Sequence, residues 1–121
     1  MVKEARMSKR DDVLAELIAK AGMQRNLAKA LIFIARRNQT TSVEIEKGTG
    51  LRQPEVSIAM QELRRRVWVE KRDVKKEGKG RPVHSYRLSV PFSAIIGTIS
   101  RSERRRIRQI EENLRKMRRL T

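Results

Sequence analysis

The chain has 121 residues, of which 38% are apolar and 36% are charged. This length suits one domain and leaves no room for a second globular domain, and the low apolar share predicts that part of the molecule is elongated or buried only in a dimer. Thirty Lys and Arg against fourteen Asp and Glu give a formal net charge of +16, so we expect a polyanionic partner, with nucleic acid as the first candidate.

The sequence has no cysteine and a single histidine, His84. It therefore excludes disulfides, thiolate nucleophiles and zinc sites built on cysteines or a histidine cluster. The apolar run at residues 31–35 is far shorter than the roughly 20 residues of a membrane span, and the N-terminus is too polar for a signal peptide. We expect a soluble, cytoplasmic, nucleoid-associated protein without a bound metal or cofactor.

Residues 1–10 are polar and unpatterned, and we expect them to form a frayed arm. A helix is predicted from Asp11 to Gly22, because Asp11 and Asp12 suit the positive end of the helix dipole and apolar residues recur at helical spacing. These are Val13, Leu14, Leu17, Ile18 and Ala21. A second helix over residues 23–38 is the most hydrophobic segment and should cross the core. Its inner face is predicted to comprise Leu27, Ala30, Leu31, Ile34 and Ala35, with Asn38 as its cap.

A short third helix is predicted within residues 40–50, where Ser or Thr serves as the N-cap, Glu44 or Glu46 lies in the first turns, and Gly48 or Gly50 ends the helix. A fourth helix begins near Gln53, since Pro54 is tolerated in a first turn. Its inward face is predicted to comprise Val56, Ala59 or Met60, Leu63 and Val67. The short, glycine-bearing joint between these two helices is typical of a helix-turn-helix.

Residues 67–74 and 83–88 are rich in β-branched and aromatic residues and flank the opening KKEGKGRP, so they predict a β-hairpin with a long tip. His84 is expected to be an ordinary strand residue, and Trp68 and Tyr86 to be packing residues. Helix, short helix, turn, helix and hairpin is the order of a winged helix-turn-helix domain, a mainly α fold with a small β-hairpin (α+β).

The segment from residue 91 to residue 121 is predicted to be one helix, with Gly97 and Ser100 or Ser102 as places where it kinks or restarts. Apolar residues in it alternate at gaps of three and four, the spacing of a coiled-coil seam. We interpret this seam as a homodimer interface; direct binding of the basic helix to DNA or to a membrane surface stays open. The seam residues are Ile96, Ile107, Ile110, Leu114 and Met117.

The sequence LRQPEVSIAMQELRRRVWVEKRDVKKEGKGRPVHSYRLS, residues 51–89, resembles the recognition helix and wing of archaeal and bacterial MarR, ArsR and TrmB-type regulators. The resemblance covers roughly residues 24–90. It implies a winged helix-turn-helix DNA-binding domain, here residues 11–90, followed by a C-terminal dimerisation helix, here residues 91–121. Such regulators commonly have Gly at the position of Val67, where the recognition helix joins the wing.

Outward-facing side chains of the fourth helix suit a DNA major groove. Gln can bond adenine through two hydrogen bonds, Arg can bond guanine, Ser serves a base or a phosphate, and an apolar side chain can touch a thymine methyl. The N-terminal half of a recognition helix enters the groove, so the expected reading residues are Arg52, Gln53, Ser57, Ile58 and Gln61. Arg64 and Arg65 are expected to meet phosphate, with a solvated helix end as the alternative.

The hairpin tip carries more cations than a turn requires: Lys75, Lys76, Lys79 and Arg81. We interpret the tip as a wing that meets phosphates or enters the adjacent minor groove. The tetrapeptide KGRP also resembles the core of an AT-hook, which implies Arg81 in a narrow A·T minor groove.

The leading interpretation is a homodimeric, sequence-specific transcriptional regulator that binds double-stranded DNA. The alternative is a sequence-tolerant architectural or chromatin-type protein that binds mostly through charge, and RNA binding is a third class. An enzyme is not expected, because no Gly-rich phosphate loop follows a predicted strand and no Ser, His and Asp set can be assembled. Adjacent carboxylates such as Asp11 with Asp12, or Glu111 with Glu112, point in different directions on a helix and are interpreted as capping and solvated residues. No feature of the sequence identifies a small-molecule effector.

Overall fold

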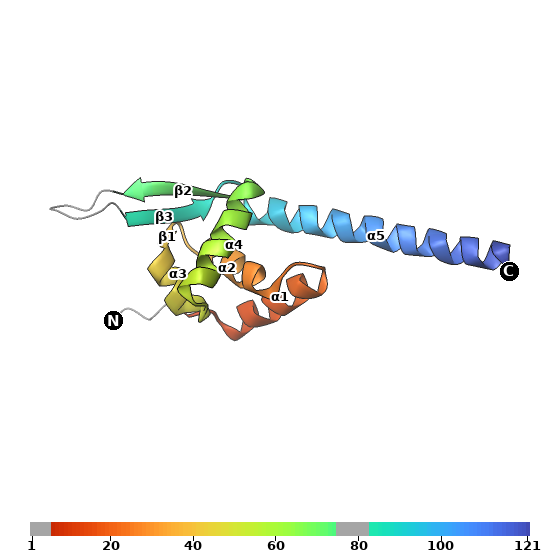
Figure 1. The fold of residues 1–121 in the computed structure, drawn as a ribbon, viewed down its shortest axis with the longest axis horizontal. Helices are drawn as coiled ribbons and strands as arrows, with labels where there is room; N and C mark the ends of the chain where they lie inside the picture. Colours follow the sequence, from red (N-terminus) through yellow and green to blue (C-terminus); the bar gives the residue numbers. More distant parts are fainter. Residues whose placement is uncertain (1–5, 75–82) are drawn as a thin grey trace. The chain divides into compact units, whose positions relative to one another are not determined.

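The computed structural model describes residues 6–74 and 83–121, and the chain forms two compact units, residues 1–90 and 91–121. In the described part of the first unit, α1 (Lys9–Lys20), α2 (Arg25–Ala35), β1 (Thr40–Thr41), α3 (Ser42–Thr49) and α4 (Gln53–Arg65) precede the hairpin of β2 (Val69–Val74) and β3 (Val83–Leu88) (Figure 1). The second unit is the single helix α5 (Phe92–Leu120). The predicted mainly α fold with a small antiparallel hairpin is confirmed.

Helix α1 begins two residues before the predicted start at Asp11, because Ser8 caps it. The Ser8 hydroxyl accepts a hydrogen bond from the backbone N–H of Asp11 at 3.1 Å, which satisfies one of the unpaired donors of the first turn. Val13 and Leu17, two of the apolar residues that predicted this helix, are 59% and 57% exposed. Ala15 and Ile18 are the buried apolar residues, so the packed face is narrower than the sequence spacing implied.

Helix α2 lies at the centre of the first unit and packs against α1, α3, α4 and β3. The predicted inner face is buried at Leu27, Ala30, Leu31 and Ile34, and Ala28, Ile32 and Phe33 are buried as well. The helix ends at Ala35, with Arg36 as its cap, so the predicted cap at Asn38 is wrong. The chain leaves the helix early because Thr40 must already be extended to pair with β3.

Reciprocal hydrogen bonds between Thr41 and Glu44 fix the start of α3, where the sequence predicted a Ser or Thr cap and Glu44 or Glu46 in the first turns. The Glu44 N–H donates to the Thr41 hydroxyl at 3.2 Å, and the Thr41 N–H donates to the Glu44 carboxylate at 3.0 Å. Gly50 ends the helix in the left-handed conformation, with φ of 80°. Leu51, which follows, is buried and leads directly into α4.

The sheet has the strand order β1–β3–β2, with antiparallel pairing throughout. Tyr86 on the central strand pairs with Thr40 on one side and with Lys71 on the other. Its ring is buried, as predicted for a packing residue, and burial raises the pKa of the Tyr86 hydroxyl. The sequence did not predict β1, because two residues carry no periodicity.

The prediction that Val67 lies on the inner face of α4 is wrong, and β2 begins at Val69 rather than at residue 67. Val67 is 69% exposed and has a positive φ of 62°. Helix α4 ends at Arg65, and the chain reverses through Val67 so that the Trp68 N–H can donate to the Leu63 carbonyl at 3.1 Å. This bond satisfies a carbonyl that the helix end leaves unpaired.

Helix α5 is one uninterrupted helix of 29 residues. The expected kink at Gly97, Ser100 or Ser102 is absent from it, since all three positions have helical backbone. Pro91 precedes the first turn, where its fixed φ is compatible with the start of a helix.

Candidate nucleic-acid interface

Helix α4 separates a buried face from an exposed one. Val56, Ala59, Met60 and Leu63 are buried. The seven candidate residues from the sequence are all exposed: Arg52, Gln53, Ser57, Ile58, Gln61, Arg64 and Arg65. Among these, Gln53, Ser57, Gln61 and Arg64 follow one another at gaps of four, four and three residues. They therefore form one stripe along the helix, because residues three and four apart are neighbours on a helix surface.

The start of the stripe is held by local hydrogen bonding. The Arg52 N–H donates to the Glu55 carboxylate at 2.9 Å, and Pro54 occupies the first turn, where a missing N–H costs nothing. Helix α3 packs against α4, and Gly50 and buried Leu51 lie in the short joint between them. The hydrogen bond between Arg52 and Glu55 and the packing of α3 therefore fix the start of the helix that carries the exposed stripe.

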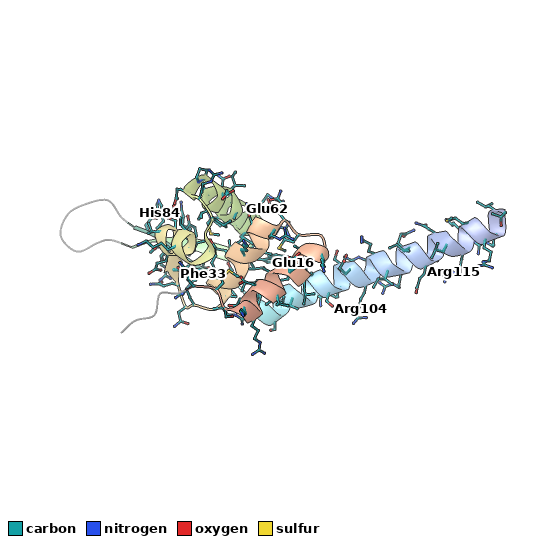
Figure 2. All side chains as sticks on the ribbon, turned by 90° about the horizontal axis from the view of Figure 1, so that it is seen from below. Glu16, Phe33, Glu62, His84, Arg104 and Arg115 are labelled. Atoms are coloured by element: carbon teal, nitrogen blue, oxygen red, sulfur yellow. The ribbon has the colours of Figure 1, made fainter. Side chains whose placement is uncertain are left out.

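Glu62 pairs with two of the three arginines at the end of α4, Arg65 and Arg66, and the sequence had not led us to expect these pairs. Its carboxylate accepts hydrogen bonds from Arg65 Nη2 at 2.6 Å and from Arg66 Nε at 2.8 Å. These two bonds lower the pKa of Glu62 to about 2. Glu62 is labelled on α4 in Figure 2. The spacing of three and four residues between an acid and two arginines was the signal that could have revealed it.

Arg66 has two contacts with neighbouring side chains, whereas Arg64 lacks an ion pair among the described residues. Arg66 pairs with Glu62. Arg66 also lies over the Trp68 ring, 5.2 Å from its centroid. Arg64 forms no ion pair within residues 6–74 and 83–121. Of the three consecutive arginines, Arg64 is therefore the one that no acidic side chain holds within these ranges.

A groove of about 470 Å³ runs beside α4, between that helix and the turn from α1 to α2. Met23, Leu27, Ile58 and Ala59 supply its apolar walls, and Glu55 and Glu62 supply carboxylates. Ile58 therefore borders this groove, whereas the Gln53–Arg64 stripe lies on the other side of the exposed face.

On the hairpin, β2 carries two exposed cations that were not among the predicted site residues, namely Lys71 and Arg72. His84 is a strand residue, as expected, and its Nδ1 lies 2.6 Å from Asp73 Oδ1 across the two strands. Arg87 pairs with Glu70 in the same way. The predicted tip residues Lys75, Lys76, Lys79 and Arg81 lie outside the described residues.

The predicted seam of α5 is exposed in the single chain. Ile107, Ile110, Leu114 and Met117 are 53%, 46%, 56% and 61% exposed, and Ile96 is intermediate. Leu120, one residue before the C-terminal Thr121, is 87% exposed.

No cluster of three or more histidine or carboxylate side chains that could hold a metal occurs among the described residues. None of their helices is both long and apolar enough to span a bilayer.

No protein-family model matches the sequence, and no curated protein matches it. Solved structures resemble the fold. TrmBL2, described as an archaeal chromatin protein with a novel mode of DNA binding, matches with a TM-score of 0.60 and 15% identity over 90% of this chain and 39% of its own. This chain therefore spans well under half of TrmBL2.

Two MarR structures match over more of their own length. A MarR family regulator from Neisseria meningitidis has a TM-score of 0.54 and 17% identity over 82% of this chain and 68% of its own. A mutant MarR from E. coli, complexed with operator DNA, has a TM-score of 0.53 and 18% identity over 90% of this chain and 86% of its own. At these identities the similarity identifies the fold alone, a winged helix like those of the matched structures.

Proposed function

We propose that this chain is a homodimeric transcriptional regulator that binds double-stranded DNA, with α4 in the major groove and the tip of the hairpin on phosphate or in the adjacent minor groove. The observation that carries the proposal is the exposed stripe of Gln53, Ser57, Gln61 and Arg64 on a helix whose opposite face is buried. A related fold is bound to operator DNA in the E. coli structure.

Each part of the surface has its own role in this proposal. Arg52, Gln53, Ser57, Ile58 and Gln61 contact base edges, with Gln53 and Gln61 best suited to adenine. Arg64, Arg65 and the tip cations Lys75, Lys76, Lys79 and Arg81 neutralise phosphates, and they hold the reading residues in register without reading sequence.

The dimer is assigned to the apolar row of α5, namely Ile96, Ile107, Ile110, Leu114 and Met117. Its gaps of three and four residues match a coiled-coil seam, and its exposed side chains would be covered by a second copy. Truncation before Ser102 should give a monomer by light scattering. A truncated chain that stays dimeric would contradict this interface.

The test of the function is selection of bound fragments from a random duplex library near physiological salt, followed by sequencing. A two-fold-symmetric motif with half-sites about 10 base pairs apart, or a multiple of that, is expected from a dimer. Gln53→Ala or Gln61→Ala should weaken binding to that motif, whereas Gln39→Ala, an exposed glutamine outside α4, should not. Equal enrichment of all fragments would contradict sequence-specific regulation.

A second candidate is a sequence-tolerant architectural protein with the same fold. The net charge of +16 favours it, as does the match to a protein described as archaeal chromatin. Its signature is binding that falls steeply with salt and shows little preference between sequences. RNA binding is a less favoured third candidate, because side chains cannot read the deep major groove of A-form RNA. Competition between duplex DNA and structured RNA for the protein distinguishes DNA binding from RNA binding.

A further inference from the structure

Helix α5 carries two different faces. The apolar row of Ile107, Ile110, Leu114 and Met117 lies on one of them. At 100° of rotation per residue, the opposite face is occupied by arginines that follow one another at gaps of four, three, seven and four residues. They are Arg101, Arg105, Arg108, Arg115 and Arg119, and we refer to them as the arginine face.

The arginine face is exposed, and little of its charge is neutralised by the chain itself. All five side chains are exposed. Arg115 pairs with Glu112 at 3.0 Å, and the other four form no ion pair within the described part of the chain. Glu103 pairs with Arg106, which lies outside the arginine face. Figure 2 labels Arg115 on this helix.

We propose that the arginine face of α5 is a second DNA-binding surface, which contacts the phosphate backbone of a duplex without reading its sequence. A guanidinium can form two parallel hydrogen bonds with a phosphate, which makes arginine well suited to this contact. Arg101 and Arg119 are separated by about 27 Å along the helix, which corresponds to about eight base pairs of duplex.

The chemistry of the other face distinguishes DNA from a membrane as the occupant. Helices that bind membrane surfaces have a broad apolar face with Trp, Phe and Leu. The apolar row of α5 is instead a narrow seam, and no aromatic residue follows Phe92 in the sequence. A narrow seam suits one partner helix, which leaves the arginine face free for a polyanion.

The arrangement of the arginine faces in a dimer rests on the proposed function, because the dimer is part of that proposal. When two α5 helices pair through their apolar rows, their arginine faces point away from each other. One dimer then presents two phosphate-binding surfaces on opposite sides, in addition to its two α4 helices. We expect such a dimer to bring two duplexes together.

The test compares two full-length variants that each lose three positive charges. One carries Arg101→Gln, Arg105→Gln and Arg108→Gln on the arginine face, and the control carries Lys9→Gln, Arg10→Gln and Lys20→Gln on α1, where all three side chains are exposed. Binding to a duplex of random sequence is measured over a range of salt concentrations. The slope of log K against log salt should become shallower by about 2 to 3 in the first variant, and by less than about 1 in the control.

Equal changes of slope in the two variants would overturn the proposal, because they would reflect net charge alone. Unchanged binding in the first variant would overturn it as well. Light scattering and circular dichroism should show the same dimer and helix content for both variants, since glutamine is a good helix former. The arginine-face variant is also tested on vesicles of anionic phospholipid and on structured RNA. If it loses binding to either of these and keeps its binding to duplex DNA, the proposal is overturned.

The proposed function is tested by different substitutions. Gln53→Ala with Gln61→Ala should abolish preference for the selected motif and leave the salt dependence on random duplex unchanged. If those substitutions have no effect on sequence preference, sequence recognition by α4 is contradicted. Phosphate binding by α5 is tested separately, by the arginine-face variant.

Discussion

Gly22 and Val67 occupy the same position in the same kind of helix end. At the end of α1, the Met23 N–H donates to the Ile18 carbonyl at 3.4 Å, and Gly22 between them has φ of 107°. At the end of α4, the Trp68 N–H donates to the Leu63 carbonyl at 3.1 Å, and Val67 has φ of 62°. Both are Schellman motifs, but only the first has the glycine that this conformation favours.

Val67→Gly should therefore stabilise the protein, by about 1 kcal/mol, because a left-handed conformation is costly for a β-branched residue and free of steric cost for glycine. Little packing is lost, since Val67 is 69% exposed. Urea denaturation of both proteins measures the difference. The control is Val43→Gly, at a 53% exposed position within α3, which should destabilise because glycine disfavours helix. A less stable Val67→Gly variant would contradict the assigned conformation.

Asp11→Asn should lower the stability of the first unit. Asp11 is buried at the start of α1, and its Oδ1 accepts a hydrogen bond from Arg36 Nε at 3.0 Å, which links α1 to the end of α2. We expect a loss of about 1 to 2 kcal/mol, near the lower end of the roughly 1.5 to 3 kcal/mol for hydrogen bonds to charged groups, because the Arg36 side chain is half exposed. Asp12→Asn removes the same charge from the same helix turn at an exposed position, so it isolates the contact from the helix dipole. Equal losses in the two variants would show that the Arg36 contact contributes nothing.

Glu62→Gln should strengthen binding to duplex DNA several-fold. In the free protein Glu62 holds Arg65 and Arg66, and these bonds must loosen before either guanidinium can meet a phosphate. The substitution also removes a negative charge from α4, so Glu16→Gln on α1 is the charge-matched control. Salt-dependent binding assays should give a steeper slope, by about 1, for Glu62→Gln alone. Weaker binding in this variant would mean that Glu62 positions the arginines for DNA.

The carboxyl of Glu62 should titrate near pH 2 in an NMR experiment, below its ordinary value of 4.5. Because the pKa is lower in the folded protein, the contacts of Glu62 contribute to stability above about pH 4.5 and are lost as the pH falls through about 2. Arg65→Gln with Arg66→Gln should return the midpoint toward 4.5. A midpoint near 4.5 in the unmodified protein would show that the two ion pairs do not persist in solution.

Leu114→Glu should convert the proposed dimer to a monomer, because it places a charge in the middle of the apolar row. Gln109→Glu introduces the same charge on the same helix away from that row and should leave the dimer intact. Light scattering at matched concentrations measures both. A dimeric Leu114→Glu variant would contradict the interface on α5. The exposed Val13 and Leu17 of α1 would then be the next candidate interface.

Elements with their own local signal could be predicted from the sequence. The Thr41–Glu44 capping box, Pro54 in the first turn of α4 and the apolar spacing of α2 each depend on neighbours in sequence, and these helices were predicted close to their observed bounds. The exposed face of α4 followed from the same periodicity.

Features set by distant contacts could not be predicted. Strand β1 exists because Thr40 and Thr41 pair with β3, more than 40 residues later in the chain. The burial of Asp11 depends on Arg36, and the early end of α2 depends on β1. Val67 was placed on the inner face because helical periodicity was continued one turn too far. Its side chain turns outward because the helix has already ended.

The strand order leaves β2 at the edge of the sheet, with backbone groups available for pairing with another chain. Four consecutive charged residues, Glu70, Lys71, Arg72 and Asp73, occupy that edge strand. Charged edge strands resist the sheet-to-sheet association that leads to aggregation. The charges of β2 therefore oppose pairing of this strand with the sheet edge of a second copy, at whatever concentration the copies meet.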